Sequence, residues 1–263
     1  MFIVLYKYQD EQMDWYWLKA LLLIFPAMLS AAAGYIVNDI YDTVTDSINK
    51  PERCTVNKTI SKKNAWILYW SLSFTSIGIS IAFSFYYFVV ILVVNTLLFL
   101  YAYKIKGIPI VGNLLVALLS ASVITCCLLL IKFETWSGTF NFMGYTIFAF
   151  FISLIREIVK DMQDIEGDAV AGYKTYPILY GIKVSKILIY ALVTIQILLG
   201  SIYAVITFGI DLYVSSVIMA IISLTLLLFI NLLAKSKSKE DYKKCSMLLK
   251  ALMLLGVMNL IFV

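Results

Sequence analysis

Long runs of apolar residues constrain this chain more than any other feature of its sequence. The chain has 263 residues, of which 62% are hydrophobic and 14% charged, whereas soluble domains carry about 25% charged residues. A run of roughly 18 or more apolar residues is long enough to cross a bilayer as a helix and too long for a barrel strand. Such runs occupy residues 15–37, 65–83, 85–103, 108–131, 142–159, 187–208, 212–234 and 246–263. The sequence therefore predicts an all-α, polytopic transmembrane helix bundle with eight full spans.

The first eight residues, Met1 to Tyr8, are apolar but too short to cross a bilayer. They lack the basic start and the small-residue cleavage site of a signal peptide. We interpret them as the end of a further helix whose beginning is missing, and a short interfacial segment is the alternative interpretation.

The basic residues are concentrated in alternate connections between the apolar runs. All but Lys7, Lys19 and Lys132 of the 21 Lys and Arg residues lie in 42–64, 104–107, 156–186 and 235–250. The positive-inside rule predicts that these connections face the cytoplasm. The net charge of +5 reflects this topology, so we expect anionic membrane lipid and not nucleic acid as its counterpart.

The chain contains four cysteines and no histidine. The cysteines show neither a zinc-ligand spacing nor a disulfide framework. The lack of histidine excludes catalytic triads that depend on histidine and haem sites with an axial histidine.

Two aspartate motifs with the same D-x-x-D-x-x-x-D spacing each follow a long apolar run. The first contains Asp39, Asp42 and Asp46, and the second contains Asp161, Asp164 and Asp168. At about 100° per residue, the three positions share one helical face. Glu157 would extend the second stripe toward the membrane, and Gly167 would loosen the helix so that Asp168 is placed less securely. The recurrence predicts one domain over 1–263, built from two pseudo-repeat halves of roughly 1–135 and 136–263.

Carboxylates near the membrane are unfavourable unless cations offset them. One stripe alone is equally consistent with a structural layer of ion pairs, but two identical stripes on one side favour a binding site. Mg²⁺ prefers oxygen ligands and fills its shell with water and phosphate oxygens. The motifs therefore predict Mg²⁺ ions that bind the diphosphate of a polyprenyl diphosphate, whose tail would lie between the helices. The candidate cations for contact with phosphate are Arg53, Lys58, Lys104, Lys106, Lys160 and Lys174. Taken singly, each is better explained as a charge that sets the topology, except Lys160, which we expect to contact phosphate because it lies within the second motif.

Aromatic residues near the motifs are also candidates for the site. Tyr35, Tyr41, Tyr101 and Tyr103 would line the reacting end of the substrate and stabilise a cation over their ring faces. The alternative is that they pack the bundle or belong to an interfacial aromatic belt.

Three segments resemble the motifs of the UbiA superfamily of intramembrane prenyltransferases. They are N-D-I-Y-D-T-V-T-D-S-I-N-K-P-E-R from Asn38, Y-A-Y-K-I-K-G-I-P-I-V-G-N from Tyr101, and R-E-I-V-K-D-M-Q-D-I-E-G-D from Arg156. The resemblance covers nearly the whole chain and implies a nine-helix fold, which agrees with Met1 to Tyr8 as the remnant of the first helix.

The resemblance also implies roles for individual residues. Asn38, Asp42 and Asp46, supported by Asp39, would serve one Mg²⁺–diphosphate half, and Asp161, Asp164 and Asp168 would serve the other. Arg53 and a lysine of the 104–106 turn would contact phosphate. The allylic diphosphate would ionise and an acceptor would capture the prenyl group.

The identity of the acceptor depends on the branch of the superfamily. The second motif, followed by G-Y-K-T-Y-P from Gly172, resembles the geranylgeranylglycerol-phosphate geranylgeranyltransferase branch, which forms ether lipids. The run R-C-T-V-N-K from Arg53 departs from the pattern common after the first motif. An aromatic prenyltransferase of quinone synthesis, with 4-hydroxybenzoate or dihydroxynaphthoate as acceptor, is therefore the alternative.

Two further interpretations belong to other classes. A transporter would use intramembrane carboxylates, but it predicts charges in broken helices at mid-bilayer, whereas these motifs lie at helix ends. An inactive truncated paralogue would account for the short first segment. For the enzyme, we expect an integral protein of a prokaryotic cell membrane whose active site faces the cytoplasm, and the sequence indicates no protein partner.

Overall fold

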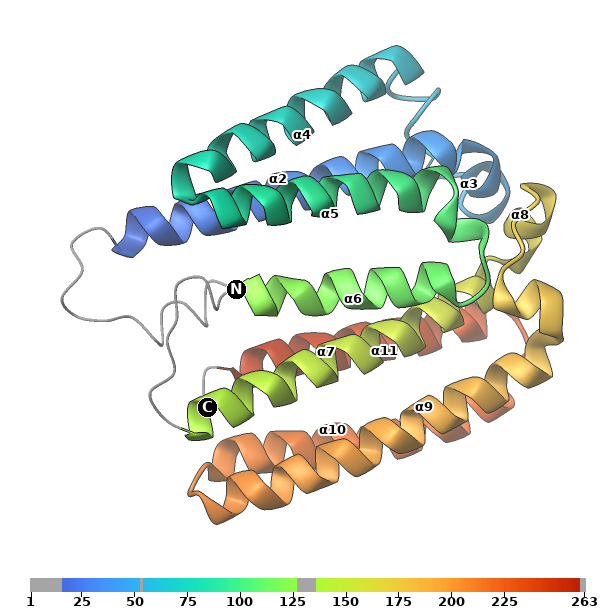
Figure 1. Cartoon of the computed structure of the whole chain (residues 1–263). Helices are drawn as coiled ribbons and strands as arrows, with labels where there is room; N and C mark the ends of the chain where they lie inside the picture. The colour runs from blue at the N-terminus through green and yellow to red at the C-terminus, as the bar shows by residue number, and fades with distance from the viewer. Residues whose placement is uncertain (1–15, 53, 127–135, 261–263) are drawn as a thin grey trace. The chain divides into compact units, whose positions relative to one another are not determined.

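The computed structural model describes residues 16–52, 54–126 and 136–260 (Figure 1), and these residues are predominantly α-helical. In these ranges the only β contact is an isolated bridge between Val56 and Ile60. The contacts divide the chain into two compact units, which are described separately. The first comprises the described residues up to Gly112 together with Glu166–Lys174, and the second comprises most of the remainder.

The first unit is built on three long helices. These are α2 (Tyr16–Tyr41), α4 (Lys62–Phe83) and α5 (Phe85–Tyr103), and each packs against the other two. The short elements α3 (Thr43–Asn49) and η1 (Ile105–Gly107) follow α2 and α5, and α8 (Ile165–Val170) lies almost wholly in this unit. Serines cap α4 and α5, because the hydroxyls of Ser61 and Ser84 accept hydrogen bonds from backbone N–H groups of the first turn.

A polar bridge joins the three long helices of the first unit inside their apolar contact. The Ser76 hydroxyl donates to the Pro26 carbonyl at 2.8 Å and lies 2.7 Å from the Ser30 hydroxyl, which accepts from the Asn95 amide at 2.8 Å. All three polar side chains are buried. Lipid tails are as apolar as leucine, so close packing and such hydrogen bonds, not hydrophobic burial, hold membrane helices together.

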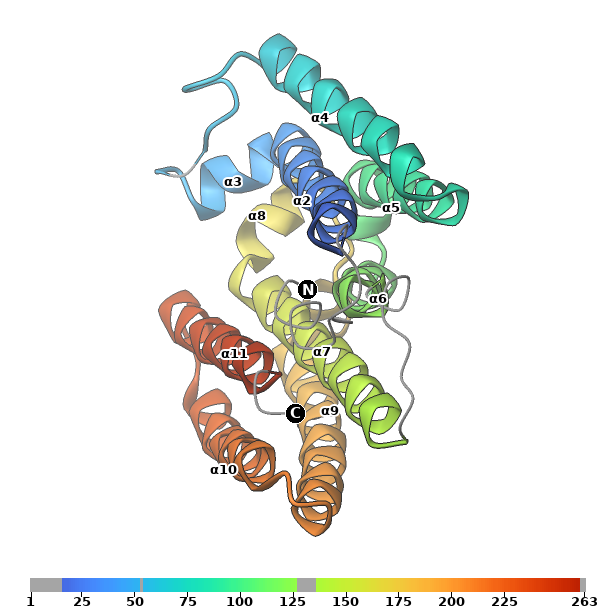
Figure 2. The same cartoon turned by 90° about the vertical axis from the view of Figure 1, so that its left-hand side faces the viewer.

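The second unit contains α6 (Val111–Thr125) apart from its first two residues, α7 (Trp136–Gln163), α9 (Tyr176–Gly209), α10 (Tyr213–Lys235) and α11 (Lys239–Asn259). The last four helices form a ring, in which α7 contacts α9 and α11 while α10 contacts the same two helices (Figure 2). Their shared core includes Ile155, Ile189 and Phe229, and Ala117 of α6 joins it. A capping box at Ser238 and Asp241 starts α11.

The predicted all-α membrane bundle is confirmed. Among the described residues, six helices are long and apolar enough to cross a membrane, and they match six of the eight predicted runs. In the run 108–131, the described helix α6 has 15 residues. Residues 246–259 of the last run belong to α11, which begins with several charged residues. The total of eight spans therefore stays a prediction. Met1 to Tyr8 lies outside the described residues.

Candidate active site: two broken acidic helices

Both aspartate motifs lie where a long helix breaks into a short one. Helix α2 ends at Tyr41 and α3 begins at Thr43, so that Asp42 occupies the junction with φ −85° and ψ 6°. In the same way α7 ends at Gln163 and α8 begins at Ile165, with Asp164 between them. The prediction that each motif lies on one continuous helix is therefore wrong, because one non-helical residue separates two helices in each motif. The second aspartate of each motif instead marks the break.

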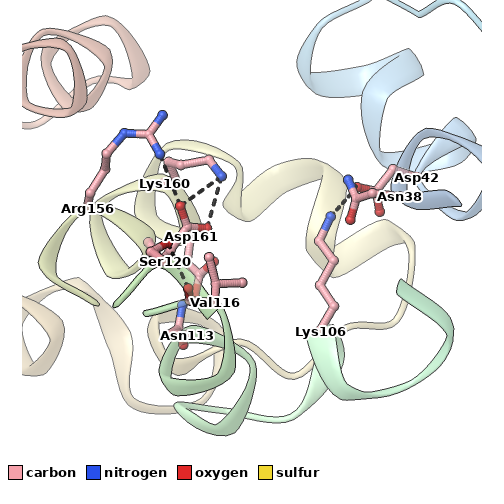
Figure 3. Close-up of polar contacts among 10 residues, drawn as sticks. Asn38, Asp42, Lys106, Asn113, Val116, Ser120, Arg156, Lys160 and Asp161 are labelled. Carbon is pink, nitrogen blue, oxygen red and sulfur yellow. Dashed lines mark hydrogen bonds and ion pairs between the residues drawn. The ribbon is translucent and has the colours of Figure 1, made fainter. Parts of the chain in front are cut away.

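Asp42 collects polar contacts from three separate segments of the first unit. The Asn38 amide donates to Oδ2 at 2.5 Å, the Lys106 ammonium also donates to Oδ2, and the Tyr173 hydroxyl donates to Oδ1 at 3.4 Å. Figure 3 shows Lys106 extended toward Asn38 and Asp42. Asp42 is only 3% exposed, so its charge is countered inside the protein and not by water.

Lys106 lies between this carboxylate and an aromatic ring. Its ammonium nitrogen is 5.5 Å from the centroid of the Tyr173 ring, within the range of a cation–π contact. Burial by itself would lower the pKa of Lys106, but Asp42, Asp168 and Asp46 outweigh it and raise that pKa above its ordinary value. Burial and the same carboxylates raise the pKa of Tyr173 well above its usual range. Lys106 is therefore a cation and Tyr173 a neutral donor at neutral pH.

The sequence alone gave no role to Tyr173, although this residue lies in the run G-Y-K-T-Y-P from Gly172. Its backbone N–H donates to the Asp168 carbonyl at 2.9 Å, and the N–H of the next residue, Lys174, donates to the Gly107 carbonyl at 3.1 Å. These bonds fix the segment after α8 against the turn that carries Lys106. Residue spacing could not have predicted the hydrogen bond between Tyr173 and Asp42, because these residues are 131 positions apart.

Asp168 is held by tight packing between α8 and α3. A Cβ atom on Gly167 would lie 2.4 Å from the Asn49 amide nitrogen and 2.7 Å from the Thr45 carbonyl oxygen. The Gly167 N–H donates to the Asn49 side-chain oxygen at 3.2 Å, and Asp168 is only 2% exposed. The prediction that Gly167 loosens the helix and places Asp168 less securely is therefore wrong. The glycine permits a close approach that fixes Asp168 in the same unit as Asp42 and Lys106.

The rest of the second motif lies in the second unit. On α7, Asp161 accepts a hydrogen bond from the Asn113 amide at 2.8 Å. One turn earlier, the buried Glu157 accepts from Arg156 Nη1 at 3.1 Å and from Lys160 Nζ at 3.0 Å. Lys160 therefore contacts Glu157, and Asp164 follows at the helix break.

The other predicted phosphate-binding cations are less enclosed. Lys104 and Lys174 are exposed, and the exposed Lys58 donates to the Pro51 carbonyl at 2.5 Å within its own loop. Arg53 lies outside the described residues. Among the acidic residues, Asp39 and Asp46 are half-buried.

The tyrosines differ in their surroundings. Tyr41 makes edge-on contacts with Trp66 at 5.9 Å and with Tyr103 at 5.8 Å between ring centroids, in an aromatic cluster formed by α2, α4 and α5. Tyr101 is half-buried on α5, whereas Tyr35 is largely exposed. Bundle packing therefore accounts for Tyr41 and Tyr103.

The donor atoms of the first unit fit a Mg²⁺ ion that also binds phosphate. In the part of the chain that the structure describes, no three acidic or thiol side chains converge closely enough to hold a metal alone. The Asn38 side-chain oxygen is buried without a hydrogen-bond partner, and carboxylates supply the neighbouring oxygens. Mg²⁺ typically takes one or two carboxylates and completes its shell with water and phosphate oxygens, so this sparse, oxygen-only donor set suits it.

Comparisons with known proteins agree with this geometry. Residues 2–255 match the UbiA prenyltransferase family. A digeranylgeranylglyceryl phosphate synthase of Methanobrevibacter smithii is 31% identical over 90% of this chain and 83% of the relative. A synthase of the same name from Thermococcus kodakarensis is 34% identical over 63% of this chain, and the alignment spans 58% of that relative.

Two solved structures share the fold. One, from work on digeranylgeranylglyceryl phosphate synthase in membranes, has a TM-score of 0.69 and 28% identity, and covers 99% of this chain and 90% of the other. A UbiA homologue from Archaeoglobus fulgidus bound to DMAPP and Mg²⁺ has a TM-score of 0.71 and 17% identity, over 98% of this chain and 92% of the other.

Proposed function

This chain belongs to the UbiA prenyltransferase family, and on that premise we propose that it joins a geranylgeranyl group to geranylgeranylglyceryl phosphate through an ether bond. The observation that carries the proposal is the likeness to a synthase of this name over nine-tenths of the chain. The oxygen-only donor set around Asp42 supports it, because such a set suits Mg²⁺ with a diphosphate.

In this proposal the first unit holds the diphosphate of the allylic donor. Asn38, Asp42, Asp46 and Asp168 supply oxygen ligands for Mg²⁺, which when bound acts as a Lewis acid toward the departing diphosphate. Lys106 is a half-buried cation beside these carboxylates, and it contacts the phosphate oxygens on which charge develops. Arg53, Lys58, Lys104 and Lys174 supply further positive charge from the connections.

The reaction breaks the allylic C–O bond of the diphosphate and forms a C–O bond to the acceptor hydroxyl, which loses its proton. We also propose Asp161 and Asp164 as oxygen ligands for Mg²⁺, as the resemblance of the second motif implies. The tail and the acceptor are lipids, which supports a site at the headgroup level of a prokaryotic cell membrane, and the distribution of basic residues supports the cytoplasmic side.

The proposal is tested with purified protein in detergent or nanodiscs. Geranylgeranyl diphosphate and geranylgeranylglyceryl phosphate should give the ether product by mass spectrometry, together with free diphosphate, and chelation of Mg²⁺ should stop both. Asp42→Asn and Asp168→Asn should each lower the rate by at least about a hundredfold. Asp211→Asn, an exposed aspartate in the α9–α10 connection, should retain the parental rate.

The same assay separates the alternatives. Product formed from 4-hydroxybenzoate or dihydroxynaphthoate, with none from geranylgeranylglyceryl phosphate, would replace the proposed acceptor with an aromatic one. Full activity in Asp42→Asn or Asp168→Asn would refute the proposed roles of these residues.

A further inference from the structure

Three charged side chains of α7 form a compact group inside the second unit. Arg156, Glu157 and Lys160 all lie within the candidate span Gly138–Gln163, and Arg156 and Lys160 are four residues apart on one helical face. Glu157 is only 7% exposed and accepts hydrogen bonds from both cations. Ionisable side chains in a membrane-spanning segment are unfavourable, and they usually mark a functional site.

One N–H donor of the Arg156 guanidinium has no hydrogen-bond partner. Its contact with Glu157 uses Nη1 at 3.1 Å, whereas its Nε–H is buried without a hydrogen-bond partner. An unmet N–H of a charged group is costly in a setting with little water. Nε together with Nη2 forms the planar fork with which arginine binds two oxygens of a phosphate.

We propose that Arg156 and Lys160, both held by Glu157, bind the phosphate monoester of the lipid acceptor. The arginine contributes its fork, and the lysine adds a second cation on the same helical face. A carboxylate that holds both cations limits their motion, so less side-chain freedom is lost when the phosphate binds.

The position of Arg156 indicates what kind of phosphate it would meet. It lies seven residues before the end of the span, or about 10 Å along the helix. A ligand that reaches this depth is itself anchored in the bilayer, which fits a phosphate attached to an isoprenoid glycerol ether. The inference rests on the proposed function, because it names the part of the acceptor that this group recognises.

The kinetic test compares the phosphorylated acceptor with its dephosphorylated counterpart, geranylgeranylglycerol, at saturating geranylgeranyl diphosphate and Mg²⁺. Arg156→Gln should raise KM for the phosphorylated acceptor about tenfold or more, because a charge-assisted hydrogen bond is lost. KM for geranylgeranyl diphosphate should not change. The preference for the phosphorylated over the dephosphorylated acceptor should largely disappear, and Arg156→Lys should recover only part of it because lysine lacks the fork.

The chain offers a matched control for the lysine. Lys243 pairs with Glu240 three residues earlier at 3.5 Å on an exposed face, as Lys160 pairs with Glu157 at 3.0 Å. Lys160→Gln should raise the same KM, and Lys243→Gln should leave it unchanged. Arg156→Gln keeps the Lys160–Glu157 pair, so this variant should unfold at nearly the parental temperature.

A binding measurement separates failure of this inference from failure of the proposed function. At one concentration, geranylgeranylglyceryl phosphate should raise the unfolding temperature of the parent more than that of Arg156→Gln, and geranylgeranylglycerol should raise the two equally and by less. Such binding without turnover would refute the proposed function and leave the phosphate site in place. Turnover with unchanged kinetics in Arg156→Gln would refute the phosphate site and assign the group a structural role only. Equal stabilisation by phosphatidic acid would overturn the acceptor assignment in favour of a general lipid-phosphate site.

Discussion

The packing of Gly167 against α3 gives the sharpest structural prediction. In Gly167→Ala the new methyl group would lie 2.4 Å from the Asn49 amide nitrogen and 2.7 Å from the Thr45 carbonyl oxygen. The side chain of Asn49 can turn away, but the carbonyl oxygen belongs to the backbone of α3, so one of the two short helices must move. Overpacking of this kind costs about 1–3 kcal/mol, and the better helix propensity of alanine returns at most about 1 kcal/mol.

The movement should affect activity more than stability, because Asp168 is the next residue. We expect Gly167→Ala to destabilise the protein by about 1–2 kcal/mol and to lower the prenyl-transfer rate by at least about tenfold, since a misplacement of about 1 Å can cost a hundredfold in rate. Gly78→Ala is the control, because Gly78 lies inside α4 with no atom within 4 Å of a new Cβ.

The two variants are compared by thermal unfolding in one detergent and by the rate of ether product formation. Gly78→Ala should unfold at the parental temperature or slightly above it and should keep full activity. If Gly167→Ala matched the parent in both measurements, the contact between α8 and α3 would not constrain Asp168, and the packing argument would be wrong.

Three further predictions concern the first unit. Tyr173→Leu should raise KM for geranylgeranyl diphosphate about two- to fivefold, because a cation–π contact of about 0.5–1 kcal/mol no longer holds Lys106. Tyr173→Phe keeps the ring and should leave this KM close to the parental value; equal KM values in both variants would argue against the contact. Asn95→Leu should destabilise the protein by about 0.6–1.7 kcal/mol in thermal unfolding, because it removes the polar bridge to Ser30, and Thr96→Val, an exposed change on the same helix, should not. Mg²⁺ together with geranylgeranyl diphosphate should raise the unfolding temperature by an amount equivalent to about 2.7 kcal/mol at a hundred times Kd, and the absence of any shift would contradict the proposed donor set.

The membrane fold could be predicted from the sequence because bilayer thickness imposes a length on every span. The runs that became α2, α4, α5, α7, α9 and α10 are long and apolar whatever their neighbours are, so their identity as helices needs no tertiary information. The two aspartate motifs were visible for the same reason, since carboxylates next to such runs stand out.

The placement of the site residues depended on contacts that spacing does not encode. The sequence by itself determined the helices, the acidic motifs, the oxygen-based chemistry and the family. Only the tertiary structure assigned Asp168 and Asp161 to different units, joined Tyr173 to Asp42, and gave Gly167 its role against Asn49. The physical reason is that helical periodicity assumes an unbroken helix, whereas the breaks at Asp42 and Asp164 redirect the chain and let packing between distant segments decide which side chains meet.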